Sequence, residues 1–133
     1  MIILIVSGFI SPEFGYPQGQ TANGRICLAK VVSFDPDSIL CQPLLNGEKD
    51  SVAFYSGVVT LSPDQSGEIH NNEVYEEMIV PLEGEGQLKV TRQGTLTVKF
   101  GKIAFIPPHT EHQMVNMGKK NFKYIYIATK SKK

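Results

Sequence analysis

Three histidines and one glutamate are the residues best suited to chemistry in this sequence. The histidines are His70, His109 and His112, and Glu77 lies between the first two. Imidazole and carboxylate side chains at the ends of neighbouring strands can converge on one point inside a β-barrel. Two neutral histidine nitrogens and one carboxylate suit a mononuclear site for a divalent transition metal with open positions. Spacing alone leaves a second interpretation open, because a histidine at a strand end is commonly held there by a simple hydrogen bond.

The elements that would position these side chains are short and extended. Apolar runs rich in Val, Ile, Thr, Phe and Tyr alternate with Gly, Pro, Asn and Asp, a pattern typical of β-strands and turns. We expect strands in the runs 26–32, 52–55, 58–61, 78–82, 87–90, 95–98, 102–106 and 122–127. No stretch of about twelve residues repeats apolar positions at helical spacing, so helix is limited to a turn or two near 37–45. The pattern predicts an all-β sandwich or small barrel.

The composition is that of one globular domain, residues 1–133. Hydrophobic residues make up 41% of the chain and charged residues 20%, and 13 Lys and Arg balance 13 Asp and Glu. This neutral balance argues against a nucleic-acid-binding protein. No apolar run approaches the roughly 18 residues that span a bilayer. We therefore expect no nucleic-acid partner and no membrane partner.

The N-terminal residues and the cysteines predict a cytoplasmic protein. Residues 1–6 are apolar with no basic residue before them, which favours a buried first strand over a signal peptide. The polar segment 11–23, rich in Gly and Pro, is expected to be a loop. Cys27 and Cys41 are too few for a disulfide framework. In a chain without an export signal we expect both thiols to be reduced and buried.

Two stretches resemble the two signatures of the cupin superfamily. The first signature is His-x-His, three or four residues, Glu, six residues and Gly, and its positions are occupied here by His70, Asn72, Glu77 and Gly84. The second is Gly, five residues, Pro, x, Gly, two residues, His, three residues and Asn, and its positions are occupied by Gly101, Pro107, His109, His112 and Asn116. The segments 82–86 and 101–108 are also cupin-like.

The resemblance implies an all-β jelly roll, the cupin double-stranded β-helix. The barrel core would cover about residues 50–128, preceded by an N-terminal strand and loop over 1–49 and followed by a basic tail at 130–133. The wider mouth of such a barrel would hold one divalent transition metal. The residue types fit Zn, Mn, Fe, Ni or Cu alike.

The resemblance also implies the metal ligands. They are His70, Glu77 and His112, while Asn72 stands where the family has its second histidine. The neutral amide oxygen of Asn72 is a weaker ligand than imidazole, and it could coordinate, hold a bound water or turn away. His109 stands where the second signature has Gly, and is either a rim histidine or a substrate-binding group.

Further substrate-binding candidates follow from the alternation of side chains along strands. Met114 shares the face of His112, and Tyr124 and Tyr126 share one face of the last strand. On the strand that begins near Glu77, both faces are largely apolar, which suits a dimer interface. Neighbouring Glu76 would point away from the metal and be solvated or in a packing contact, and Tyr75 is expected to be a loop aromatic that could cover the mouth.

These observations are consistent with three classes of function, of which the first two are favoured. The first is a metal-dependent enzyme acting on a small oxygenated metabolite, as a dioxygenase, isomerase or decarboxylase. The second is a non-catalytic cupin that binds a sugar or other metabolite, which Asn72 favours, and the third is a structural scaffold. The acidic segment 68–77 disfavours a highly anionic ligand. A homodimer is expected to cover the edge of the first strand.

Overall fold

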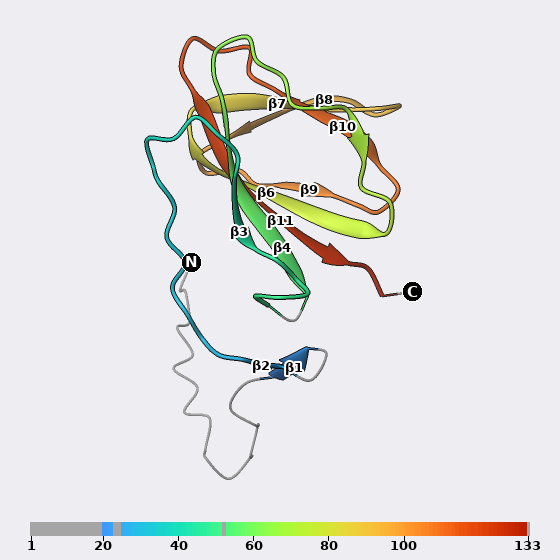
Figure 1. The fold of residues 1–133 in the computed structure, drawn as a ribbon. Coiled ribbons are helices and arrows are strands. Elements are labelled where there is room, and N and C mark those ends of the chain that lie inside the picture. The colour runs from blue at the N-terminus through green and yellow to red at the C-terminus, as the bar shows by residue number, and fades with distance from the viewer. Residues whose placement is uncertain (1–19, 23–24, 52, 133) are drawn as a thin grey trace, which may run out of the picture.

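Two antiparallel β-sheets lie face to face and enclose the interior of the protein (Figure 1). This computed structural model describes residues 20–22, 25–51 and 53–132. The five-stranded sheet has the order β3 (Gln42–Leu45), β4 (Phe54–Leu61), β11 (Phe122–Lys130), β6 (Tyr75–Glu83), β9 (Ala104–Ile106). The four-stranded sheet has the order β5 (His70–Asn71), β10 (Glu111–Val115), β7 (Glu85–Val90), β8 (Gly94–Lys99). A separate two-stranded sheet pairs β1 (Gln20–Ala22) with β2 (Arg25–Cys27).

The all-β prediction is confirmed, since no described residue is helical. Among these residues there is accordingly no helical segment that could span a lipid bilayer. The runs 52–55 and 58–61, expected as two strands, belong largely to the single strand β4. The run 26–32 is extended only at its start, within β2.

Two local predictions are wrong. The helical turn near 37–45 is absent, and residues 42–45 form strand β3 at the edge of the larger sheet. Pro43 fits there because an edge strand can spare one backbone donor. The loop expected over 11–23 contains strand β1 at residues 20–22, and its other positions lie outside the described residues. The first strand expected at residues 1–6 also lies outside them.

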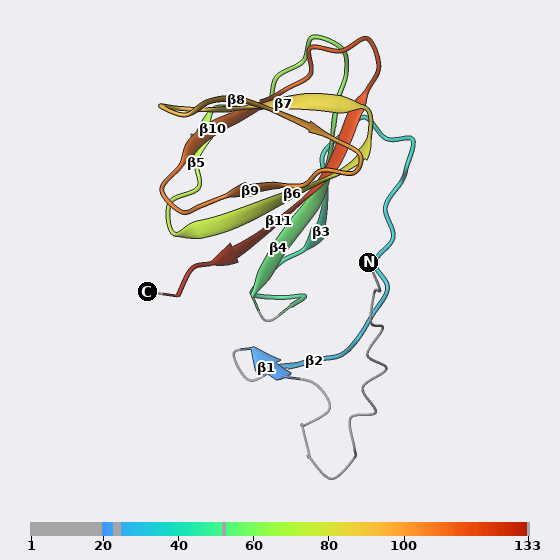
Figure 2. The ribbon, with the colours of Figure 1, turned by 180° about the vertical axis from the view of Figure 1, so that it is seen from behind.

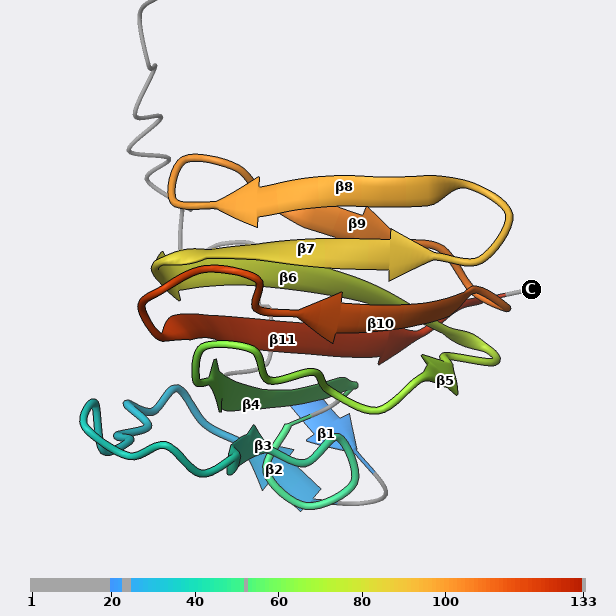
Figure 3. The ribbon, with the colours of Figure 1, turned by 90° about the horizontal axis from the view of Figure 1, so that it is seen from above.

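The chain passes from one sheet to the other at Gly84, between β6 and β7. Gly84 has φ +74°, and a Cβ there would overlap the backbone oxygen of Asn121. Only glycine meets both demands without strain. Seen from above, the two sheets form two layers, and in projection β7 lies over β6 and β10 over β11 (Figure 3).

The core fills the space between the sheets at the Phe122 end and continues beside the cavity, whose lining includes the core residues Ile79, Met114 and Tyr124. Its buried side chains come from both layers and are Leu61, Ile79, Leu88, Val90, Val98, Ala104, Ile106, Met114, Phe122 and Tyr124. Phe122 is fully buried, and a Cβ on Gly86 would overlap its ring. Each large side chain buried here contributes roughly 1.5–3 kcal/mol. The view from behind shows the same two sheets from the opposite side (Figure 2).

Part of the outer face of the larger sheet is covered by the segment before β3. The Lys123 ammonium donates a hydrogen bond to the Pro36 carbonyl, and the Thr60 hydroxyl donates one to the Ser38 carbonyl at 3.2 Å. Farther along the same face, Phe105 is 62% exposed and neighbours half-buried Met78. The homodimer predicted from the apolar faces of β6 stays a prediction.

Candidate metal centre

Three candidate ligands converge from three different strands. His70 on β5 lies directly opposite His112 on β10 in the antiparallel register, and their ring centroids are 4.2 Å apart. Glu77 reaches the same point from β6 in the facing sheet. One ligand atom of each residue lies within 4.8 Å of the other two. The structure therefore brings together two imidazoles and one carboxylate that are separated along the sequence.

Backbone carbonyls fix the orientation of both imidazoles. The Nδ1 atom of His112 lies 3.0 Å from the Thr110 carbonyl oxygen, and that of His70 lies 3.3 Å from the Glu68 carbonyl oxygen. Because a carbonyl can only accept, Nδ1 carries the hydrogen in each ring. The lone pair of each neutral ring is then on Nε2, the form in which histidine binds a metal.

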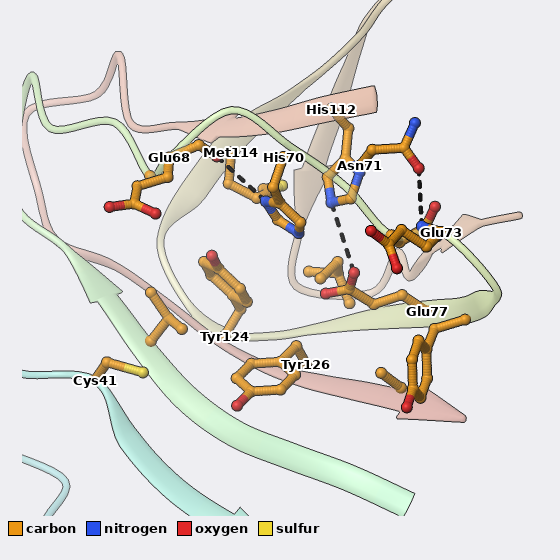
Figure 4. Close-up of a pocket in the computed structure, with 16 residues that line it drawn as sticks. Cys41, Glu68, His70, Asn71, Glu73, Glu77, His112, Met114, Tyr124 and Tyr126 are labelled. Atoms are coloured by element: carbon orange, nitrogen blue, oxygen red, sulfur yellow. Dashed lines mark hydrogen bonds and ion pairs between the residues drawn. The ribbon is translucent and has the colours of Figure 1, made fainter. Parts of the chain in front are cut away.

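The environment of His112 also sets its proton affinity. Burial lowers the pKa of His112, but the nearby Glu77 carboxylate and the bond to the Thr110 carbonyl together raise it above its ordinary value. The Nε2 atom lies 3.6 Å from the Glu77 carboxylate (Figure 4). A proton on His112 therefore competes with a metal ion for the same lone pair.

Asn72 is placed beside this centre with its amide group already engaged. Its Oδ1 accepts a hydrogen bond from the Thr110 backbone N–H at 2.8 Å, and its Nδ2 donates to the carbonyls of Pro107 at 2.8 Å and Ile106 at 3.4 Å. The side chain is 7% exposed. It connects the loop after β5 to the turn before β10. Its role as a ligand stays a prediction that these contacts disfavour.

The three ligands line one cavity of about 690 Å³ between the sheets. Of the predicted substrate-binding residues, Met114, Tyr124 and Tyr126 line this cavity, as does Tyr75 (Figure 4). His109 lies elsewhere, exposed, in a smaller hollow beside Lys130, with φ +59°. Its backbone N–H donates to the Glu73 carbonyl at 2.6 Å. Glu76 is half-buried and is not among the described residues that line this cavity.

Several lining residues were not predicted from the sequence. Cys41 was expected to be buried, but its thiol is free and exposed, and it lines the cavity. Nothing in the local sequence predicts this, because Cys41 reaches the cavity through the pairing of β3 with β4. Ala128 could have been found, since it shares the face of Tyr124 and Tyr126 on β11. Val59 lies opposite Tyr124 in the register of β4 and β11.

Comparison with known proteins supports this architecture. The family model described as "Cupin domain" matches residues 57–128, more than half of the chain. No curated protein matches the sequence. A cupin family protein with a double-stranded β-helix fold from Methanocaldococcus jannaschii is similar with a TM-score of 0.67 and 16% identity, over 77% of this chain and 91% of that chain.

Two further solved structures carry names that mention a reaction. A predicted oxalate decarboxylase from Thermotoga maritima has a TM-score of 0.62 and 21% identity, over 68% of this chain and 79% of that chain. A sugar phosphate isomerase from a cupin superfamily, from Silicibacter pomeroyi, has a TM-score of 0.59 and 21% identity, over 74% and 76%. Likeness at these identities shows the fold, a double-stranded β-helix, and not the reaction.

Proposed function

The chain belongs to the Cupin domain family, and on this premise we propose that it is a metal-dependent enzyme acting on a small oxygenated metabolite. The observation that carries the proposal is the convergence of His70, Glu77 and His112, whose ligand atoms lie within 4.8 Å of one another beside a cavity of about 690 Å³. Two histidines and one carboxylate suit a divalent transition metal and leave coordination positions for a substrate.

Each protein group has a definite part in this proposal. Glu77 supplies the anionic donor, and the two Nε2 atoms supply neutral donors whose directions are fixed by the carbonyls of Glu68 and Thr110. A divalent metal held there would supply Lewis-acid chemistry, polarising an oxygen atom of the bound metabolite. The Tyr124 side chain, 6% exposed, forms part of the cavity wall and helps to exclude water from this end.

The names of the two solved structures suggest decarboxylation of oxalate or isomerisation of a sugar phosphate. Both of those ligands are anions. No Lys or Arg side chain is among the described residues that line this cavity, whereas Glu68, Glu73 and Glu77 are. An anionic substrate would lack the guanidinium or ammonium contacts that usually bind carboxylates and phosphates. The proposal therefore adopts neither of these substrates.

A second candidate is a cupin that binds a metabolite without turning it over. Asn72 favours this alternative, because the position at which the family has a further histidine ligand holds an amide that is bonded to the turn before β10. Three protein ligands would bind metal less tightly than four. Metal occupancy therefore distinguishes the two candidates.

Cobalt titration of the chelator-stripped protein, followed by visible absorption, tests the proposal. We expect one equivalent of Co²⁺ to bind to the wild type. Glu77→Gln removes the only anionic donor, so its affinity should fall by more than the roughly 10–100-fold cost of losing an outer contact. Glu76→Gln, the neighbouring residue on the opposite face of β6, is the matched control and should bind as the wild type does.

Metal analysis of wild-type protein purified without chelator completes the test. Near-stoichiometric transition metal supports the enzyme. If only traces are found and Co²⁺ does not bind, the metabolite-binding alternative replaces it. If Glu77→Gln retains full affinity, the ligand assignment is wrong.

A further inference from the structure

The charges around the cavity are all of one sign. Glu68 and Glu73 lie on opposite sides of His70 (Figure 4), and both are exposed side chains that line the cavity. Glu77 lies at the candidate metal centre, and no described Lys or Arg lines the space. A bound divalent metal carries two positive charges, and Glu77 offsets one of them. Glu68 and Glu73, which form the mouth of the cavity, together carry two negative charges and more than offset the other. The mouth therefore carries net negative charge.

A buried hydroxyl in the same cavity lacks a partner. Tyr124 is 6% exposed, and its hydroxyl makes no hydrogen bond with the residues that the structure describes. Among the described residues, every fully buried polar side-chain atom has a hydrogen-bond partner. Because the Tyr124 hydroxyl has none, it is not fully buried, and a ligand in the cavity can reach it. A tyrosine hydroxyl carries its proton at neutral pH. It is a hydrogen-bond donor available to a ligand oxygen.

The aromatic rings of the wall complete the arrangement. Tyr124 and Tyr126 lie side by side on one face of β11 (Figure 4). Tyr75 lines the cavity from β6. Tyrosine faces attract organic cations, more strongly where water is partly excluded. Carboxylates and aromatic rings that line the same cavity, with no Lys or Arg among the described lining residues, suit the binding of an alkylammonium group.

We propose that the ligand of this cavity is a small organic cation, an amine or quaternary ammonium compound that also carries an oxygen donor. The inference rests on the proposed function for the position of that oxygen, which lies between the metal and the Tyr124 hydroxyl. The nitrogen lies toward Glu68, Glu73 and the tyrosine rings. In this proposal Glu68 and Glu73 at the mouth select the substrate by its positive charge.

Three probes that share a hydroxyl group and similar size isolate the effect of charge. They are choline, its uncharged carbon isostere in which a tert-butyl group replaces the trimethylammonium group, and the anion hydroxypropanesulfonate. Binding to the full chain is measured by ligand-observed NMR at low ionic strength, with and without one equivalent of Co²⁺. We expect choline to bind roughly tenfold more tightly than the carbon isostere, since ring and carboxylate contacts act together. The sulfonate should bind most weakly.

Two double variants test whether Glu68 and Glu73 cause the preference for choline, and a third variant tests the Tyr124 hydroxyl. In Glu68→Gln/Glu73→Gln the advantage of choline over its isostere should fall to about twofold or less. The control Asp64→Asn/Glu83→Gln makes the same change in net charge outside the cavity and should keep the full preference. Tyr124→Phe removes the donor but keeps the ring, so it should weaken choline and its isostere to the same extent.

The outcomes separate this inference from the proposed function. If Co²⁺ binds but choline has no advantage, or the sulfonate binds best, the inference is overturned and the metal centre stands. If Co²⁺ does not bind, the metal centre fails, and the same three probes on the metal-free protein still decide the charge preference. A preference that survives in Glu68→Gln/Glu73→Gln, or vanishes in the control pair, also overturns the inference.

Discussion

The two ends of the space between the sheets are filled differently, although the same strands line both. On β11, Phe122 is fully buried in the core, whereas Tyr126 and Ala128, farther along the same face, line the cavity. On β10, Met114 belongs to the core where it borders the cavity, and His112 belongs to the candidate metal centre. Strand alternation decides which side chains point inward. Residue type at each inward position then decides whether that end becomes a packed core or an open site.

This contrast predicts that the two ends can be disrupted separately. A substitution in the closed end should act on the free energy of unfolding, because the side chains there make apolar contacts on all sides. A substitution in the open end should act on metal and ligand binding, because its polar groups can be partly rehydrated. The predictions below test the contrast in order of expected effect.

Phe122→Ala should have the largest effect on stability. Phe122 is fully buried, and its ring centroid lies 5.2 Å from that of Tyr124. Truncation leaves a cavity, and we expect the free energy of unfolding to fall by about 3–5 kcal/mol in urea denaturation. The control Phe100→Ala, at a phenylalanine 81% exposed, should change it by less than about 0.5 kcal/mol. Equal losses in the two variants would contradict the position of the closed core.

Each end also contains one asparagine whose amide joins two loops. At the closed end Asn116 is fully buried, and its Nδ2 donates to the carbonyls of Leu61 and Lys120, both at 2.8 Å. At the open end Asn72 is 7% exposed and bonds to Thr110 and the turn before it. Asn116→Ala should lower the free energy of unfolding by about 2–3 kcal/mol, because its partners are left buried and unpaired.

Asn72→Ala should lower the free energy of unfolding less, by about 1–2 kcal/mol, since water can reach its partners. It should, however, weaken Co²⁺ binding roughly tenfold, because the Thr110 carbonyl that orients His112 loses its anchor. Asn116→Ala should leave Co²⁺ affinity unchanged in the folded protein. Titration and urea denaturation of both variants measure the two effects. If Asn72→Ala instead binds Co²⁺ as the wild type does, Asn72 does not position His112.

The sequence predicted the inward-facing residues better than their contacts. Alternation and the cupin-like signatures placed His70, Glu77 and His112 at neighbouring strand ends, and the structure brings them together. The hydrogen bonds of Asn72 could not be predicted, because its partner Thr110 lies 38 residues away and is brought close only by the fold. Cys41 was missed because it precedes the edge strand β3, whose short, proline-containing sequence has no clear strand pattern.

The smallest expected effect is a pH dependence that belongs to the open end. In the metal-free protein the pKa of His112 is raised above its ordinary value of about 6.5, since the contacts with Glu77 and the Thr110 carbonyl outweigh burial. A group that binds its proton more tightly when folded stabilises the protein fully below about pH 6.5, and this contribution is lost as the pH rises through the raised pKa.

The free energy of unfolding of chelator-treated wild type should therefore fall as the pH rises from about 6.5 through the raised pKa of His112, measured relative to Glu77→Gln. Using the variant as reference cancels groups that titrate in the same way in both proteins. Glu77→Gln removes the Glu77 contribution to the pKa of His112 and leaves the contact with the Thr110 carbonyl in place. Co²⁺ affinity of the wild type should change in the opposite direction and increase with pH, since the metal and the proton compete for the same Nε2 atom. A difference between the two proteins that does not vary with pH would mean that His112 and Glu77 do not share a proton. The open end would then be held together by its backbone hydrogen bonds alone, as the closed end is held by its packing.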